Sequence, residues 1–128
     1  MTDPRVDEWV AKAEEDYVAA RTLDANATPG PVCFHCQQRI GNRLKAALAA
    51  NGLPVRRTHD LVILNAFVAE HDARFEPLTD QVSILSAYSV VSRYPGMSMT
   101  PRDAQEALAT ASVLRSQMRT LLGLPRGT

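Results

Sequence analysis

The feature of this sequence that most constrains its fold is the spacing of its apolar residues, which recur every three or four positions in five separate stretches. That spacing places apolar side chains on one face of an α-helix. No stretch alternates apolar and polar residues as a half-buried strand does, and β-branched residues never cluster for long. We therefore expect an all-α fold, an antiparallel bundle of about five helices with an up-and-down four-helix core and one short extra helix.

Two long helices are expected in the first half of the chain. The first opens with Asp3 as its cap and Pro4 in its first turn, and it fades over residues 26–30. The second ends at Asn51 and Gly52, a pair typical of a left-handed helix terminator. The buried face of the second helix is expected to consist of Phe34, Gln37, Ile40, Leu44, Ala47 and Leu48.

Three further helices are expected in the second half. A short one begins near His59 with Thr58 as its cap, and the next breaks at the proline-glycine turn of residues 95–96. The last is the clearest, because Thr100 is a good cap and Pro101 suits the first helical position. Its apolar stripe consists of Ala104, Ala107, Leu108, Ala111, Leu114, Met118 and Leu121.

Length and composition narrow the class of protein. The 128 residues fit one domain, 1–128, and 14 basic side chains balance 14 acidic ones, as in an ordinary globular protein. No window approaches the roughly 18 apolar residues of a membrane span, and the first residues are polar and acidic where a signal peptide is basic and then apolar. We therefore expect a cytoplasmic protein without membrane association and with its two cysteines reduced.

The sign of the charge alternates along the chain. Residues 1–30 hold seven acids against three bases, and residues 31–59 hold five bases and no acid. One interpretation is that neighbouring helices carry complementary rims, worth about 0–1 kcal/mol per ion pair. The other is a phosphate-binding patch on the second helix and the loop after it. The basic residues of that patch are Arg39, Arg43, Lys45, Arg56 and Arg57.

Cys33, His35 and Cys36 allow a metal interpretation, because Cys-x-x-Cys is half of a zinc site. Zinc needs two further ligands, and the only other histidines are His59 and His71. We therefore expect no metal or other cofactor and interpret the cysteines as small, partly buried thiols at the start of the second helix.

Four polar positions have both a structural and a functional interpretation. Gln37 on an apolar face needs a hydrogen-bond partner, which favours an inter-helix or inter-subunit bond. His59 before Asp60 is either a site residue or part of a helix cap. Arg93 and Tyr94 precede the proline-glycine turn, so either Arg93 caps the preceding helix while Tyr94 covers the bundle end, or the turn presents both side chains to a ligand.

Four segments occur in a characteristic order: an aromatic and Ala-rich acidic stretch, a Gln-Gln pair with a later Leu-Lys-Ala run, His-Asp-Leu and Arg-Tyr-Pro. In this chain they are Trp9 to Ala20, Phe34 to Gln38 with Leu44 to Ala46, His59 to Leu61, and Arg93 to Pro95. Together they resemble the HEPN family, small all-helical proteins. Gly41 is a departure, because relatives usually carry a Glu there. A mid-helix glycine costs about 1 kcal/mol relative to Ala, which suggests a close helix approach at this position.

The resemblance implies a helical bundle that dimerises and works beside a minimal nucleotidyltransferase chain, in a pair of toxin-antitoxin type. Some HEPN proteins are metal-independent ribonucleases with an Arg followed after four to six residues by a His, an arrangement suited to phosphate binding and proton transfer. No Arg stands at that distance before His35, His59 or His71. We therefore lean against an enzyme and keep two alternatives: a ribonuclease with a non-standard site, and a structural dimer without ligand.

The expected function is a nucleotide- or RNA-binding or interaction module, most simply a homodimer. Some apolar residues lie off the main stripes, and they form either the dimer interface or a wider buried face of the third and fourth helices. These residues are Val62, Ile63, Val90 and Val91. The expected ligand contacts are Arg39, Arg43, Arg56, Arg93, Tyr94 and His59.

Overall fold

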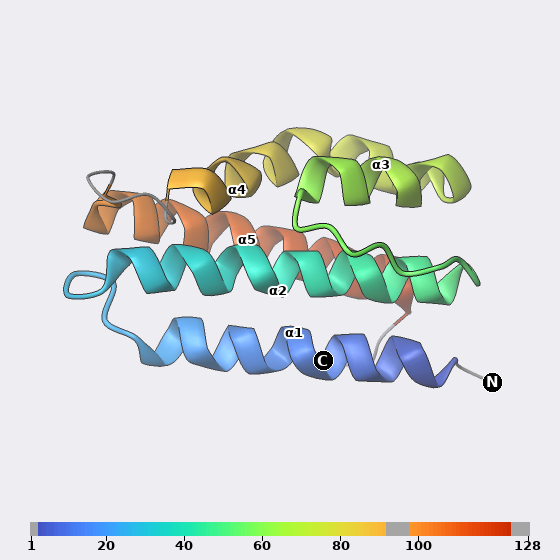
Figure 1. Cartoon of the computed structure of the whole chain (residues 1–128), viewed down its shortest axis with the longest axis horizontal. Coiled ribbons are helices and arrows are strands. Elements are labelled where there is room, and N and C mark those ends of the chain that lie inside the picture. Colours follow the sequence, from blue (N-terminus) through green and yellow to red (C-terminus); the bar gives the residue numbers. More distant parts are fainter. Residues whose placement is uncertain (1–2, 92–97, 124–128) are drawn as a thin grey trace.

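The computed structural model describes residues 3–91 and 98–123 (Figure 1). Within these ranges the chain forms five α-helices and one short 3₁₀ segment, and it contains no strand. The elements are α1 (Pro4–Thr22), α2 (Pro29–Ala50), α3 (Leu61–His71), η1 (Ala73–Leu78), α4 (Thr79–Val91) and α5 (Pro101–Leu122). The all-α bundle of five helices expected from the apolar spacing is therefore confirmed.

Side-chain caps fix the beginnings of α1 and α5. The Asp3 carboxylate accepts a hydrogen bond from the backbone N–H of Arg5 at 2.9 Å, and Thr100 and Asp103 form a reciprocal capping box. Such caps satisfy donors that the first helical turn leaves unpaired and are each worth about 1 kcal/mol. The expected end of α2 is also confirmed, because Gly52 follows it with a φ of 70°.

The beginning of α3 differs from the expectation. Its cap is Asp60, whose carboxylate accepts from the backbone N–H groups of Val62 and Ile63 at 3.0 and 3.1 Å. The Thr58 hydroxyl instead accepts from the backbone N–H of Asp60 at 3.1 Å. The helix begins at Leu61, two residues after His59, and the prediction that Thr58 caps it is wrong, because the Asp60 carboxylate satisfies two orphan donors. The interpretation of His59 and Asp60 as part of a helix cap is confirmed for Asp60.

Helix α2 is the centre of the arrangement, and it packs against α1, α3, α4 and α5. Figure 1 shows α1 along one side of α2, the α3–α4 pair along the other side, and α5 behind. Helices α1 and α4 run opposite to α2. The loop of residues 51–60 returns along α2, so that α3 runs in the same direction as α2. Helix α5 follows the reversed α4 and also runs in the direction of α2. Helix α1 is thus held chiefly by α2.

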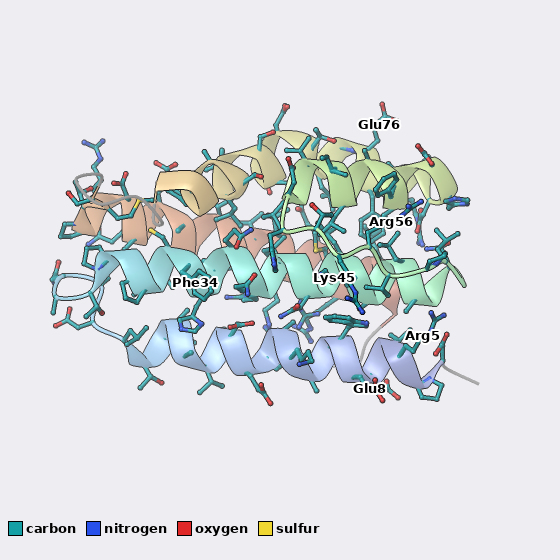
Figure 2. All side chains as sticks on the ribbon, viewed as in Figure 1. Arg5, Glu8, Phe34, Lys45, Arg56 and Glu76 are labelled. Carbon is teal, nitrogen blue, oxygen red and sulfur yellow. The ribbon has the colours of Figure 1, made fainter. Side chains whose placement is uncertain are left out.

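The main apolar core fills the space between α2, α3, α4 and α5. Gly41 brings α2 close to α3, because a Cβ placed there would lie 3.2 Å from Cδ2 of Leu61; the close approach suggested by this glycine is confirmed. Phe34 was expected in the core but is 37% exposed, because Cys33, about 100° away around α2, takes the core position. Figure 2 shows Phe34 on the outer surface of α2. The largest apolar core residues are Ile40, Leu44, Leu48, Leu61, Leu64, Phe75, Leu85, Leu114 and Met118.

Two of the four residues expected at a dimer interface have described side chains. Ile63 is 45% exposed, and Val62 is half-buried against the core. The side chains of Val90 and Val91 lie outside the described ones. Among the helices of the described ranges, none is long and apolar enough to cross a membrane.

Candidate phosphate-binding site

Five arginines gather where α1, α2 and α5 meet, and we call them the arginine cluster. They are Arg21 of α1, Arg39 and Arg43 of α2, and Arg115 and Arg119 of α5. Residues four apart share one helix face, so α2 and α5 each present two arginines to this region, one turn apart.

Tyr17 of α1 is the common contact of three of these arginines. The guanidinium carbons of Arg39, Arg115 and Arg21 lie 4.3, 4.4 and 5.0 Å from the centre of its ring. Nη1 of Arg21 also donates to the Tyr17 hydroxyl at 2.8 Å. Cations over an aromatic ring gain about 0.5–2 kcal/mol each, so the ring partly offsets the repulsion among the guanidinium groups.

Glu14 of α1, one turn before Tyr17, supplies negative charge to the cluster. Its Oε1 pairs with Nη2 of Arg43 and lies 3.1 Å from Nε of Arg115, and its Oε2 lies 3.3 Å from Nη2 of Arg115. One carboxylate therefore bridges arginines of two different helices and connects α1 to α5.

Arg39 is a buried member of the cluster whose donors are only partly used. Its side chain is buried, its Nη2 donates to the Ala111 carbonyl at 3.3 Å, and its Nε and Nη1 make no hydrogen bond. No carboxylate of the described residues pairs with it. Burial, aided by the neighbouring Arg115 and Arg43 charges, lowers the pKa of Arg39 to about 10. A buried cation with unused donors gains strongly from an added anion.

Burial also lowers the pKa of Arg43, but here a carboxylate opposes the shift. The nearby charges of Arg115 and Arg119 push this pKa in the same direction as burial. The Glu14 carboxylate opposes this shift by favouring the charged form. The cluster is thus a partly compensated positive site, with Arg39 and Arg43 buried, Arg115 nearly so and Arg21 exposed at its edge.

The structure divides the residues that the sequence suggested as one patch. Arg39 and Arg43 lie in the cluster, buried instead of presented on an open helix face. Arg56 is exposed in the 51–60 loop and stacks on Phe67 of α3 at 4.6 Å (Figure 2). Lys45 is buried between α2 and α1, 5.1 Å from the ring centre of Trp9. A single continuous patch is therefore not formed by these residues, because Arg39 and Arg56 contact different helices.

Of the remaining expected contacts, His59 lies in the described part of the chain. His59 is exposed, and its backbone carbonyl accepts from Nε2 of the buried Gln37 at 2.7 Å. Gln37 thus has the hydrogen-bond partner that a buried amide needs, but this partner lies in the segment before α3 and not in another helix. Arg93 and Tyr94 lie outside the described residues.

Sequence reasoning missed Glu14, Tyr17 and Arg115. Tyr17 stands at helical spacing from the apolar residues Ala13 and Ala20 and therefore resembles one more residue of an apolar stripe, and Arg115 directly follows the buried Leu114. Polar groups at the edge of an apolar stripe were the available signal, but only the packing of α1 beside α5 shows that they meet.

A second polar group joins α1 to α2 through Asp16. Its Oδ1 lies 2.8 Å from Nδ1 of His35, and its Oδ2 accepts from Nδ2 of Asn42 at 3.0 Å. A carboxylate at Nδ1 orients an imidazole and favours the tautomer whose Nε2 accepts a proton. The His35 side chain is about 29% exposed, so part of it is accessible to solvent.

Cys33 and Cys36 are free and fully buried. Burial raises the pKa of Cys33 to about 11 and that of Cys36 to about 12. Thiols of this kind are poor nucleophiles at neutral pH. Across the described parts of the chain, no three His, Cys, Asp or Glu side chains are grouped to hold a metal ion.

The fold defines a small all-helical module in which a charged cluster and a small apolar cluster together join α1 to the rest of the bundle. The HEPN domain family matches residues 6–120, and the chain therefore belongs to the HEPN family. The resemblance expected from the four sequence segments is confirmed. HEPN domains often dimerise and bind nucleic acid, so membership supports a nucleotide- or RNA-related module in general terms. A search of curated proteins found no match to the chain.

Proposed function

We propose that this chain is a nucleotide- or RNA-binding module and that the arginine cluster is where it contacts phosphate. The observation that supports this most is the incomplete charge compensation of the cluster: Glu14 pairs with Arg43 and Arg115, while the buried Arg39 retains two unused donors. Arginine is well suited to bind phosphate because its planar donors match two phosphate oxygens at once.

The ligand contacts proposed for this function are Arg39 and Arg43 at the base of the cluster and Arg115 and Arg21 at its edge. Buried cations in a water-poor site attract an anion more strongly than exposed ones do. Arg56, Arg93, Tyr94 and His59 stay predicted contacts of the ligand.

An equilibrium binding titration tests this function. Fluorescence anisotropy of a labelled single-stranded RNA oligomer, at low salt, would compare the wild type with Arg115→Ala and with Arg102→Ala. Arg102 is exposed in the first turn of α5 and serves as the matched control. We expect Arg115→Ala to weaken binding about tenfold and to flatten the salt dependence, whereas Arg102→Ala changes little. Equal affinities for the two variants would contradict the proposal, and flat titrations for every protein would favour a structural dimer without ligand.

The proposed setting is a homodimer that acts beside a separate minimal nucleotidyltransferase chain, in a toxin-antitoxin-like pair within the cytoplasm. This rests on the family membership. Native mass spectrometry of the protein captured from its own cells tests both parts. A mass of two copies together with a chain of nucleotidyltransferase size would support the setting, and a monomer without partner would contradict it.

A second candidate is a metal-independent ribonuclease, favoured by the Asp16–His35 pair. An imidazole held at Nδ1 by a carboxylate is suited to remove a proton from a ribose 2′-hydroxyl. Incubation with total RNA, followed by the His35→Gln variant and by His71→Gln as an exposed control, tests it. Cleavage that disappears only in His35→Gln would establish the enzyme, and no cleavage by the wild type would exclude this candidate.

A further inference from the structure

Glu14 occupies the arginine cluster in the way that an anionic ligand would. Its two oxygens face Arg43 from α2 and Arg115 from α5, with Arg115 bound through Nε and Nη2 at 3.1 and 3.3 Å. A phosphodiester also offers two unshared oxygens and one negative charge, so it suits the same donors. The carboxylate of the chain itself and a nucleic-acid phosphate would therefore compete for one set of guanidinium groups.

The surroundings of Glu14 allow it to leave and favour a replacement. Its side chain is 24% exposed and lies on α1 at the edge of the cluster, whereas that of Arg43 is fully buried. Removing the carboxylate alone would leave the Arg43 charge buried without this compensation, which is costly. Departure of Glu14 is thus favourable only when another anion enters.

Other carboxylates near α1 are differently engaged. Asp16 is held on another side of the helix by His35 and Asn42. Glu15 follows Glu14 directly, is exposed, and points about 100° away around the helix. Glu14 is therefore the α1 carboxylate placed to control access to the cluster.

We propose that Glu14 is an internal competitor that closes the arginine cluster in the free protein, and that a phosphodiester of single-stranded RNA displaces it on binding. This inference rests on the proposed function, because it assumes that the cluster takes phosphate. It adds an autoinhibitory residue: RNA exchanges the Glu14 ion pairs for phosphate contacts, and the Glu14 side chain turns to solvent.

The test compares Glu14→Gln with Glu15→Gln, two substitutions that remove the same charge from neighbouring positions. Kd values for a short single-stranded RNA oligomer are measured by anisotropy at low salt, beside the wild type and Arg115→Ala. We expect Glu14→Gln to bind about fivefold more tightly than the wild type, because a competing charge has left the site, and Glu15→Gln to differ less than twofold.

Each outcome decides between the claims. If both glutamine variants bind equally well, or if Glu14→Gln binds more weakly than the wild type, Glu14 is no competitor and the inference is overturned. Weaker binding by Arg115→Ala in the same experiment would still support phosphate binding at the cluster. If Arg115→Ala also matches the wild type, the proposed function itself fails.

A measurement on the unmodified chain keeps the test decisive should Glu14→Gln fold poorly. The side-chain carboxyl carbon of Glu14 is followed by NMR while the same RNA is added. Displacement predicts a shift of this signal toward that of an exposed glutamate, with the Asp16 carboxyl signal unchanged. An unmoved Glu14 signal at saturating RNA would overturn the inference.

Discussion

The two faces of α2 are packed by opposite means. Toward α3, α4 and much of α5, α2 presents Ile40, Leu44 and Leu48 to an apolar core. Toward α1 and the edge of α5, it presents Arg39 and Arg43 to a tyrosine and a glutamate, and the small residues Ala46 and Ala49 form an apolar cluster with α1 there. On the first face, burial of apolar area stabilises the fold without any ligand. On the second face, the buried arginines stabilise the fold only where an anion compensates their charge.

This difference separates stability from binding within one helix. A buried ion pair contributes little to stability compared with apolar residues of similar volume, so the stability of the fold does not account for the arginines on α2. The arginines lie beside α1, which is held chiefly by α2, and there they add charged contacts to the apolar cluster that Val6 and Val10 of α1 form with α2. We therefore expect substitutions on the two faces to affect different measurements.

The largest expected effect comes from the apolar face. Leu64→Ala should lower the free energy of unfolding by about 2–5 kcal/mol, because Leu64 of α3 is fully buried. Ile63→Ala is the control, since Ile63 is 45% exposed and should change stability by less than about 1 kcal/mol. Urea unfolding followed by circular dichroism measures both. Similar losses for the two variants would contradict the assigned core.

The next effect has opposite signs in stability and in binding. Arg39→Met removes a buried charge that has no described carboxylate partner, so the free energy of unfolding should stay level or rise by about 1 kcal/mol. RNA affinity should fall about tenfold. Urea unfolding and anisotropy, with the exposed Arg102→Met as control, check both signs. A loss of more than about 2 kcal/mol in stability would show that Arg39 holds the fold together instead.

A smaller effect is expected at the close approach between α2 and α3. In Gly41→Ala, the gain in helix propensity, up to about 1 kcal/mol, is opposed by the contact at 3.2 Å with the buried Leu61. We expect a net change within about 1 kcal/mol and a clear loss for the larger Gly41→Leu. Thermal unfolding of both variants measures this. Equal stability of Gly41→Leu and the wild type would show that the helices are not in close contact there.

The smallest effect concerns the buried thiols of the apolar face. Burial raises the pKa of Cys33 from 9.0 to about 11 and that of Cys36 to about 12. Above pH 9 the unfolded chain loses these protons and the folded chain keeps them, so stability falls as the pH rises. Urea unfolding between about pH 8 and 10 should show a steeper decline for the wild type than for a Cys33→Ala, Cys36→Ala double variant. Parallel declines would contradict the burial of the thiols.

Much of the fold was predictable because it depends on local sequence. Apolar spacing predicted the five helices, and the caps Asp3 and Thr100 were recognised from residue type alone. The start of α3 was missed because Thr58 and Asp60 are both good caps, and the choice depends on which one reaches the free N–H groups.

The candidate site was predictable only in part. Arg39 and Arg43 are four apart, so their shared helix face followed from sequence. Their burial and their partners did not, because Glu14 and Arg115 are about a hundred positions apart and meet only through packing on α2. Charged residues are seldom buried, and Arg39 departs from that rule although no carboxylate of the described residues pairs with it.

The most direct test of phosphate binding at the arginine cluster is an NMR titration of arginine side-chain Nε–Hε signals with a short single-stranded RNA. The Nε of Arg39 makes no hydrogen bond in the free protein, so a bound phosphate should move its signal strongly, together with that of Arg115. The signals of Arg56 and Arg102 should stay nearly unchanged under the same conditions. Movement of Arg56 or Arg102 with Arg39 and Arg115 unaffected would place the ligand elsewhere and contradict the account.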